Sequence, residues 1–362
     1  MNFGAKQIKR GKLMKINTIT IENYKSIKKL DKLPLTNLNI LVGSNGAGKS
    51  NLISFFKLLN KIIEKQLKPY SIEQGINSLL YFGLKQSKWI FGEIDFGNNK
   101  YRFKLKPANE GFLFIDEEES YFDSWHPIGR ANEETKLYDS KNVSGSLIEA
   151  LKLWKIYHFH DTSSTATVKQ SCHINNNRKL DFDAGNLAAF LYKLKQTNEF
   201  SFHRIEETIK LVAPYFEQFI LEPNALNPEK IKLEWQQKGS DNYFDAFSLS
   251  DGTLRFIGIA TLLLQPDPPD TLIIDEPELG LHPYAISVLA SLVKAFSNDK
   301  QIIASTQSVT LLDYFEPIDI IVADKEANSS VFKRLSSHEL KEWIAEYSLG
   351  EIWEKNIIGG RP

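Results

Sequence analysis

Two kinds of hydrophobic pattern occur near the start of this chain. Residues 15–21 alternate apolar and polar side chains and are rich in β-branched types, which is typical of a half-buried strand. Residues 39–42 form a short continuous apolar run, as buried parallel strands do. Apolar residues at helical spacing follow between positions 52 and 59. This part of the chain therefore predicts a mixed α/β structure.

The hydrophobic period changes to two between residues 89 and 114. Apolar side chains alternate with polar ones on either side of Gly97–Asn99, which is a turn signal. We therefore expect an antiparallel β layer here. The acidic run that follows, Asp116–Ser120, is typical of a solvated loop without a catalytic role.

The middle of the chain, residues 125–225, has a helical character. Amphipathic spacing occurs at 145–156, 185–197 and 202–213, without sustained heptads and without an internal repeat. We interpret this segment as an inserted, mainly helical lobe.

The last third of the chain is α/β again. Apolar runs at 272–274, 302–304 and 318–322 predict buried strands, and the spacing from Tyr284 to Leu292 predicts a helix between the first two.

The composition limits the class of protein. The chain has 362 residues, 44 Lys and Arg against 45 Asp and Glu, a net charge of -1, and 42% hydrophobic residues. A disordered, collagen-like or coiled-coil protein is excluded, whereas nucleic-acid binding stays open because cations can gather on one face. The single cysteine, Cys172, cannot form an intramolecular disulfide, so we expect a cytoplasmic location. The apolar run 256–264 is shorter than the about 20 residues of a membrane helix, so no membrane span is expected.

A glycine-rich loop follows the apolar run at 39–42. Residues 43–50 match the Walker A spacing G-x-x-x-x-G-K-S in full. In such a loop the backbone N–H groups close around phosphate oxygens, and the following helix directs its positive end at them. Lys49 would neutralise phosphate charge, and Ser50 would give a hydroxyl to Mg²⁺. The expected nucleotide-binding residues are Gly43, Ser44, Asn45, Gly46, Ala47, Gly48, Lys49, Ser50 and Asn51.

A second motif ends the apolar strand at 271–274. Asp275 and Glu276 follow it, as in a Walker B motif. Asp275 would hold Mg²⁺, which prefers oxygen ligands, and Glu276 would act as the general base toward water. An ordinary strand-end turn is the alternative for this pair alone, and the position downstream of the Walker A loop favours the Walker B interpretation.

A third motif, Leu249–Thr253, precedes a long apolar helix from 254 to 264. Ser250 and the Gly252 backbone at a helix N-terminus would form a second anion site. The alternative is an ordinary serine N-cap.

Together these motifs resemble the ABC-type ATPase heads of the RecF/SMC/OLD-like group, and in particular the bacterial predicted "AAA family ATPases" with a RecF-like domain. The resemblance covers residues 16 to about 325, in the family order. The segments that carry it are Ile19–Ser26, the Walker A loop, Leu249–Thr253, Asp275–Pro283 and Ala304–Ser308.

The resemblance implies a fold and a mode of action. The fold would be an α/β P-loop NTPase, an ABC-type ATPase head with a mixed sheet, an antiparallel β layer and an inserted helical lobe. ATP and Mg²⁺ would be its ligands. A homodimer would form on ATP binding, with Ser250 and Gly252 acting as the signature loop on the partner's γ-phosphate. Glu276 and Gln307 would be its catalytic residues.

Two positions depart from the pattern of the family. Most ABC ATPases have a histidine in the switch segment, where this chain has Gln307. A glutamine can orient water or donate to the γ-phosphate, but it cannot hold a proton as histidine can. The signature reads Ser-Asp-Gly in place of Ser-Gly-Gly. Slow turnover is therefore expected. For the glutamine of the Q-loop, Gln86 is a candidate, with a surface glutamine as the favoured alternative.

Other parts of the family are expected to be absent. The segment between Ser50 and Ser250 is too short, and lacks the heptads, for the coiled-coil arms of SMC proteins. The segment after Gln307 is too short for the nuclease domain of OLD proteins, so no nuclease activity in cis is expected. His158, His160, Cys172 and His173 could suggest zinc, but they lack paired Cys-x-x-Cys spacing, and structural or surface roles are favoured.

These observations lead to one architecture and two functional hypotheses. The first is an ATP-driven dimer switch in DNA-related processes, repair or phage defence, with DNA or a partner protein reading its state. The second is an ATP-sensing module with little turnover that gates an effector protein, which the glutamine at 307 favours. An ABC importer subunit is disfavoured. The expected domains are 1–13, a flexible N-terminal extension; 14–124, the first half of the ATPase core; 125–225, the inserted lobe; and 226–362, the second half of the core.

Overall fold

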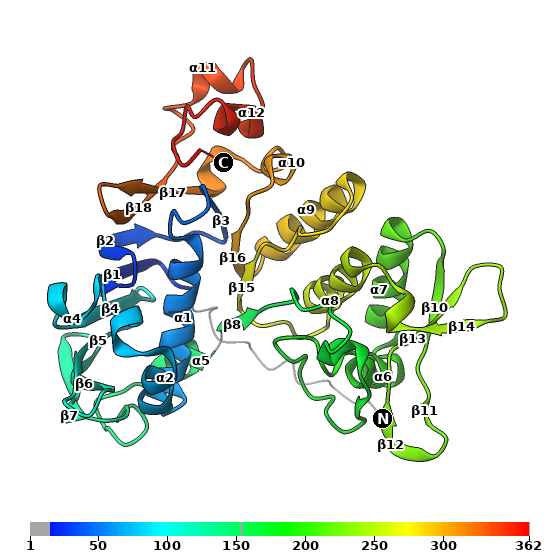
Figure 1. The fold of residues 1–362 in the computed structure, drawn as a ribbon, viewed down its shortest axis with the longest axis horizontal. Helices are drawn as coiled ribbons and strands as arrows, with labels where there is room; N and C mark the ends of the chain where they lie inside the picture. Colours follow the sequence, from blue (N-terminus) through cyan, green and yellow to red (C-terminus); the bar gives the residue numbers. More distant parts are fainter. Residues whose placement is uncertain (1–14, 153, 362) are drawn as a thin grey trace, which may run out of the picture.

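The protein is described here by a computed structural model that covers residues 15–152 and 154–361 (Figure 1). The expected flexible extension at 1–13 lies outside the described residues. Within the described part of the chain, no helix is both long and apolar enough to span a bilayer.

A six-stranded mixed sheet forms the centre of the molecule. Its order is β18-β17-β3-β16-β15-β8, and all neighbours pair in parallel except β17 and β18. The strands are β18 (Ser329–Arg334), β17 (Ile320–Glu326), β3 (Leu38–Val42), β16 (Gln301–Ser305), β15 (Thr271–Asp275) and β8 (Trp154–Tyr157). Only β16 separates β3 from β15, so segments far apart in the sequence end at the same edge of the sheet.

The central strands are continuously apolar because both faces of the sheet are covered. In β3, Ile40 and Val42 join one hydrophobic core with helices α8 (Asp251–Leu264) and α9 (Pro283–Ser297). Leu41 points to the other face and joins a second core with helix α1 (Lys49–Ile63). Successive side chains of the strand thus point into two different cores, so these three are all apolar. A strand with one solvated face would instead alternate apolar and polar residues.

A second six-stranded sheet, fully antiparallel, covers α1 on the side away from the central sheet (Figure 1). Its order is β2-β1-β4-β5-β6-β7, and the expected antiparallel layer is confirmed. The strands are β1 (Thr18–Tyr24), β2 (Ile27–Pro34), β4 (Ile90–Asp95), β5 (Lys100–Pro107), β6 (Leu113–Tyr121) and β7 (Trp125–Asn132). Short helices α2 (Leu67–Gln74), α3 (Ile76–Leu79) and α4 (Gly83–Gln86) lie between α1 and β4 in the chain.

The acidic run 116–120 lies in strand β6, so the expectation of a solvated loop is wrong. Glu118 is fully buried and accepts hydrogen bonds from the Tyr101 hydroxyl at 2.7 Å and the Lys136 N–H at 3.0 Å. Glu119 faces outward and pairs with Arg102 of β5 at 2.6 Å. The carboxylates alternate between the two faces of the strand, and cross-strand cations and hydrogen bonds satisfy them.

The boundary expected at residue 124 also differs from the structure. β7 extends the antiparallel sheet, and helix α5 (Gly145–Lys152) joins the α1 core through Leu147 and Leu151. The helical stretch expected at 145–156 ends before β8, which is an edge strand of the central sheet. Strand β8 has only four residues and follows the helix closely, so the local sequence pattern does not predict it. Its pairing with β15 is what defines it as a strand.

A second lobe follows β8 and contains both helices and small sheets. Helices α6 (Leu187–Thr197) and α7 (Glu199–Val212) match the expected helical stretches. Short strands accompany them: β9 (Cys172–His173), β10 (Phe216–Ile220), β11 (Pro223–Asn224), β12 (Asn227–Ile231), β13 (Glu234–Gln237) and β14 (Tyr243–Asp245). The lobe is therefore mixed, because the strands after α7 pair with one another and, in one case, with β9.

The C-terminal segment packs back onto the central sheet. It contains α10 (Val309–Leu312), α11 (Lys341–Ile344) and α12 (Leu349–Glu354). Trp353 of α12 is fully buried, and its indole N–H donates to the Gly360 carbonyl at 2.7 Å. The Gly360 N–H in turn donates to the Asp324 carboxylate of β17 at 3.0 Å. These bonds fix residues 353–360 against β17, the strand next to β3.

Candidate nucleotide-binding site

The Walker A loop leaves β3 and enters α1, as the sequence predicted. Two of its glycines are required by close contacts. A side chain at Gly43 would place Cβ only 2.3 Å from the Ala323 carbonyl oxygen. Gly48 has a φ of +115°, and a Cβ there would lie 2.2 Å from the Ser330 hydroxyl. The loop is therefore held from behind by strands β17 and β18.

The turn between β1 and β2 supports the same loop. Ser26 and Ser330 hydroxyls are 2.7 Å apart, and the Asn51 amide donates to Ser26 Oγ at 2.6 Å. The segment Ile19–Ser26 is thus structural support for the loop. Asn51 was expected among the nucleotide-binding residues, but its side chain is used in this support.

Gly360 lies directly against Gly43. Its φ is +60°, and a Cβ at this position would be 2.7 Å from the Ala323 oxygen and 3.2 Å from Gly43 Cα. We expect Gly360→Val to push the C-terminal segment off the loop, lowering the free energy of unfolding by about 2 kcal/mol and weakening nucleotide binding several-fold. Thermal denaturation and nucleotide titration measure both effects.

Gly111→Val is the matched control for that prediction. Gly111 also has a left-handed φ, +85°, but a Cβ there meets nothing within 4 Å. It should show only the backbone cost and leave nucleotide affinity unchanged. Equal nucleotide affinity in the two variants would contradict a role of the C-terminal segment in holding Gly43.

Lys49 is buried in its own loop. Its Nζ donates to the carbonyl oxygens of Gly43 at 2.5 Å and Ser44 at 3.2 Å. Burial lowers the pKa of the Lys49 ammonium, and the charges of Glu276, Asp275 and Glu278 oppose this shift. The Lys49 ammonium is therefore influenced electrostatically by three carboxylates at the end of β15 and in the turn after it. Phosphate oxygens would give it better partners than the two neutral carbonyls.

Asp275 and Glu276 lie at the carboxyl end of β15. The Ser305 hydroxyl of β16 donates to the Asp275 carboxylate, and the Glu276 N–H donates to the Ser305 carbonyl at 3.0 Å. Glu276 has a φ of +41°, a strained conformation for a residue with a side chain. This turn directs the Glu276 side chain differently from that of Asp275.

Gln307 meets Glu276 at the end of β16. The Gln307 amide Nε2 donates to the Glu276 carboxylate. The two residues expected to be catalytic, 31 positions apart, are therefore in direct contact. This contact follows from the parallel pairing of β15 with β16, because the carboxyl ends of parallel strands lie together.

The signature segment begins α8. Ser250 is its N-cap and accepts a hydrogen bond from the Thr253 N–H at 3.2 Å. Gly252 packs on the loop after β15, since a Cβ there would lie 2.2 Å from the Gly280 carbonyl oxygen. In residues 15–152 and 154–361, the hydrogen bonds of the Ser250 side chain stay within its own helical turn. The structure thus places Gly252 against the loop after β15, and among the described residues it shows no bond from the Ser250 side chain to the Walker A loop.

Arg255 is a functional candidate that sequence reasoning missed. From α8 it donates to the carbonyls of Leu279 at 2.9 Å, His160 at 2.8 Å and Phe159 at 3.2 Å. It therefore joins the signature helix to the loop after β15 and to the segment after β8. A single arginine in an apolar helix gave no signal for these partners, which come from three separate segments.

The candidate Q-loop residue Gln86 is not part of this arrangement. It is exposed at the end of α4, in the antiparallel layer. β8 is the neighbour of β15 on the side opposite β16. The residues that follow β8 are His158, Phe159 and His160. His160 Nε2 lies 2.7 Å from the Asp275 carbonyl oxygen, and burial lowers the pKa of His158. His160 therefore lies beside Asp275 at this edge of the sheet.

The ligand set of the site fits Mg²⁺ and a polyphosphate. Asp275 gives a carboxylate, Ser50 an exposed hydroxyl at the start of α1, and Lys49 a cation. Gly46, at the front of the loop, has nothing within 4 Å of a Cβ, so that face is open. Oxygen donors suit a hard cation. Across the described residues, no three His, Cys, Asp or Glu side chains group as a metal site, and His173 lies on β9 in the second lobe.

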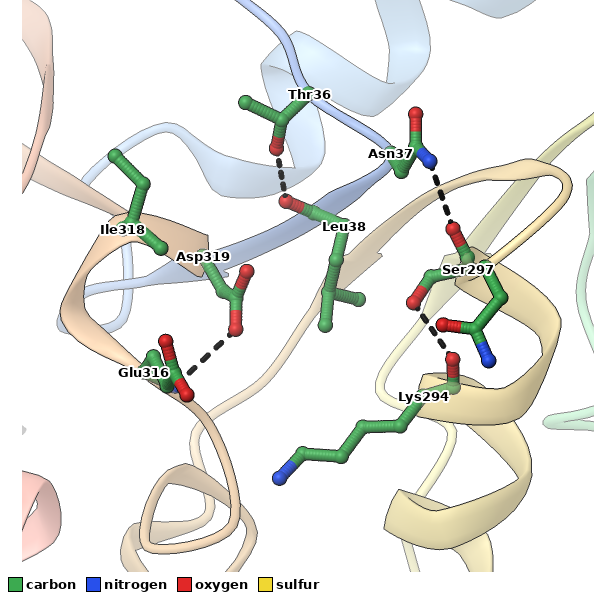
Figure 2. A pocket seen from close by; sticks show the side chains of 9 residues that line it. Thr36, Asn37, Leu38, Lys294, Ser297, Glu316, Ile318 and Asp319 are labelled. Atoms are coloured by element: carbon green, nitrogen blue, oxygen red, sulfur yellow. Dashed lines mark hydrogen bonds between the residues drawn. The ribbon is translucent and has the colours of Figure 1, made fainter.

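A cavity lies away from this site. It has a volume of about 500 Å³ and is lined by Thr36, Asn37, Leu38, Lys294, Glu316 and Asp319, among others (Figure 2). Leu38 is the first residue of β3, whereas the Walker A loop follows its last. The cavity is therefore at the amino ends of the strands, opposite the candidate site. Asp319 Oδ2 accepts a hydrogen bond from the Glu316 N–H, so its carboxylate is used within the fold.

Comparison with known proteins identifies the family. A sequence model described as "AAA domain, putative AbiEii toxin, Type IV TA system" matches residues 38–313, which is more than half of the chain. The chain belongs to this family. The matched residues of this AAA-domain protein run from β3 and the Walker A loop to the switch segment after β16.

A curated relative and two solved structures agree with this assignment. Old nuclease of Escherichia phage P2 is 24% identical over 385 residues, covering 91% of this chain and 62% of that protein. The chain thus spans less than two thirds of the length of Old nuclease. An Smc head bound to the C-terminal winged-helix domain of ScpA has a TM-score of 0.62 at 18% identity, covering 90% of this chain and 99% of that one. The Pyrococcus furiosus Smc head with an extended coiled coil, bound to the C-terminal domain of ScpA, has a TM-score of 0.55 at 15% identity, covering 91% and 98%.

These similarities confirm the resemblance to ABC-type ATPases of the RecF/SMC/OLD-like group. They also confirm the fold class, an α/β P-loop NTPase of the ABC ATPase head type. The AAA-domain protein is therefore built around an ATPase domain. The roles of its individual site residues, the metal and the partners stay predictions.

Proposed function

We propose that this protein is an Mg²⁺-dependent ATPase that acts as an ATP-gated dimer switch in the cytoplasm. The observation that carries the proposal is the meeting of the two motifs at the carboxyl edge of the central sheet. The charges of Asp275 and Glu276 act on the Lys49 ammonium, and the Gln307 amide donates a hydrogen bond to the Glu276 carboxylate. One ligand at the loop could therefore be reached by all four groups.

The chemistry follows from the positions of these groups. Lys49 would exchange its two carbonyl partners for phosphate oxygens, and the loop N–H groups would surround the same oxygens. Ser50 and Asp275 would hold Mg²⁺, which supplies charge to polarise the phosphate oxygens. Glu276 would accept a proton from the attacking water, and Gln307 would fix the orientation of the Glu276 carboxylate.

The dimer part of the proposal rests on the signature segment. Ser250 and Gly252 start a 14-residue helix whose positive end favours an anion. The anion of the proposed sandwich is the γ-phosphate bound by a second copy of this chain. Asp251, which is 60% exposed, would oppose that contact. Lys169 lies 3.6 Å from the Asp251 carboxylate, with its side chain only 9% exposed, and offsets its charge.

Removal of this lysine gives a prediction. We expect Lys169→Met to weaken ATP-dependent dimerisation by about 10-fold, because Asp251 would then face the phosphate with its charge uncompensated. ATP affinity of the monomer should stay unchanged. Sedimentation or light scattering with ATP measures the dimer. The double variant Lys169→Met with Asp251→Asn should recover it, and an unchanged dimer in the single variant would contradict the proposed signature contact.

The biological process is proposed as DNA-related, in repair or phage defence, with DNA or an effector protein as the partner. Support comes from the family description, which includes a putative AbiEii toxin, and from the similarity to a phage nuclease. The test is whether duplex DNA raises the ATPase rate of the purified protein. An unchanged rate with single-stranded and duplex DNA would count against a DNA partner.

The second candidate is an ATP sensor with little turnover that gates an effector protein. The glutamine at 307 favours it, because glutamine orients a neighbour but cannot hold a proton. Single-turnover hydrolysis separates the two candidates. If the wild-type protein hydrolyses bound ATP no faster than Glu276→Gln, the sensor is supported and the hydrolytic switch is not.

A further inference from the structure

Glu278 is a buried carboxyl group that the proposed chemistry does not use. It lies three residues after Asp275, in the turn that follows β15, and is only 7% exposed. Its Oε1 accepts hydrogen bonds from the Thr306 hydroxyl at 2.5 Å and from the Gln307 N–H at 3.3 Å. The two donors belong to the loop after β16. Glu278 therefore bridges the turn that carries Glu276 and the loop that carries Gln307.

The second oxygen of this carboxyl has no partner. Within residues 15–152 and 154–361, Glu278 Oε2 is one of three buried side-chain polar atoms without a hydrogen bond. Burial raises the pKa of Glu278, and the nearby charge of Glu276 raises it further. An apolar side chain of similar size would avoid both the burial cost and the unsatisfied atom. The carboxyl is thus unfavourable for folding at this position, and its bonds to the loop are what it contributes.

The bonds of Glu278 continue through the loop. The Thr306 hydroxyl that donates to Glu278 accepts a hydrogen bond from the Ser308 N–H at 2.9 Å. Ser308 in turn caps α10, accepting from the Leu311 N–H at 3.1 Å. The backbone is therefore fixed on both sides of Gln307, whose own side chain is exposed. An exposed glutamine has many rotamers, and the fixed backbone limits those that reach Glu276.

We propose that Glu278 is a positioning residue for ATP hydrolysis, which holds the loop 306–308 so that the Gln307 amide meets the Glu276 carboxylate. This inference rests on the proposed hydrolytic function. Glu278 acts through Gln307, whose N–H it accepts, and is not itself a catalytic residue. Its effect is on the rate of the chemical step, because a small misplacement of an orienting group can cost up to about 100-fold.

Three variants test this role by steady-state and single-turnover hydrolysis. Glu278→Ala should lower kcat by about 10- to 100-fold, with KM for ATP within about threefold of wild type. Glu278→Gln keeps the accepting oxygen Oε1 and should keep kcat within about threefold. Thr306→Val removes the same bond from the other side, so the double variant with Glu278→Ala should be no slower than Glu278→Ala alone.

A matched control separates positioning from general stability. Glu118 is also a buried, hydrogen-bonded carboxylate, but it lies in the antiparallel layer. Glu118→Ala should lower thermal stability while leaving kcat of the folded protein unchanged. Hydrogen exchange gives a second readout, because the Gln307 and Ser308 amides donate within the fixed loop. Both amides should exchange at least 10-fold faster in Glu278→Ala, and not in Glu118→Ala.

Wild-type kcat in Glu278→Ala, or unchanged exchange of the two amides, would overturn the positioning role. Failure of the proposed function looks different. A wild-type protein that binds ATP without any single-turnover hydrolysis would refute the hydrolytic switch, and amide exchange would then still decide whether Glu278 holds the loop.

Discussion

Replacement of Lys49 by alanine is expected to abolish ATP binding at physiological concentrations. In the structure the ammonium is buried, and its hydrogen bonds within the described residues go to the carbonyl oxygens of Gly43 and Ser44. A charge-assisted bond to phosphate is worth about 3 kcal/mol, which corresponds to an about 100-fold loss of affinity. The remaining negative charges of Asp275 and Glu276 would then repel the phosphates without a compensating cation, so the loss should reach or exceed this figure. Calorimetric titration with ATP and Mg²⁺ measures it.

The control for Lys49→Ala is Lys57→Ala on the same helix. Lys57 is exposed and lies two turns beyond the loop. The Lys57→Ala variant should bind ATP as the wild type does. Both variants should remain folded, since the bonds of the Lys49 ammonium within the described residues go to carbonyl oxygens of its own loop. Unchanged ATP affinity in folded Lys49→Ala would overturn the assignment of the Walker A loop.

The Walker A loop and the strand before it were predictable because their signals are local. Residues 43–50 carry the whole motif in eight positions, and the flanking strand and helix follow directly. The close approach of Ala323 and Ser330 explains why glycine is required at positions 43 and 48. The sequence showed the glycines, but it could not show which segments lie behind them.

The rest of the site depends on the order of strands in the sheet, which no local pattern encodes. The contact of Gln307 with Glu276 exists because β16 lies beside β15, and His160 reaches the Asp275 carbonyl because β8 lies on the other side of β15. Gln86 was the candidate for the Q-loop glutamine, with a surface glutamine as the favoured alternative. In the structure it belongs to a different layer.

Burial was the second property that the sequence could not supply. Glu118 and Glu278 both lie in acidic segments, and glutamate is a residue type that is usually exposed. Both side chains are nevertheless buried. In β6 the alternation of strand faces buries one carboxylate of the run, and in the turn after β15 the packing of the loop 306–308 buries another. An acidic run therefore does not distinguish a solvated loop from a strand whose partners satisfy it.

Replacement of Glu276 by glutamine is expected to stop hydrolysis while leaving ATP bound. Glutamine has nearly the shape of glutamate and keeps an oxygen to accept from Gln307, but it cannot take a proton from water. We expect a 100- to 10,000-fold lower single-turnover rate, on the order of a lost general base, and an ATP affinity within about threefold of wild type. The phosphate contacts proposed for Lys49 and the loop would be unchanged in this variant.

Because hydrolysis would separate the proposed dimer, the same variant should accumulate it. Light scattering of Glu276→Gln with ATP and Mg²⁺ should show a mass close to twice that of the monomer, and with ADP the monomer mass. Glu326→Gln is the matched control, since Glu326 is exposed at the end of β17, and it should hydrolyse ATP as the wild type does. A monomer of Glu276→Gln with saturating ATP would contradict the sandwich of two heads. A stable ATP-bound dimer together with an unchanged hydrolysis rate would instead assign the general base to another residue.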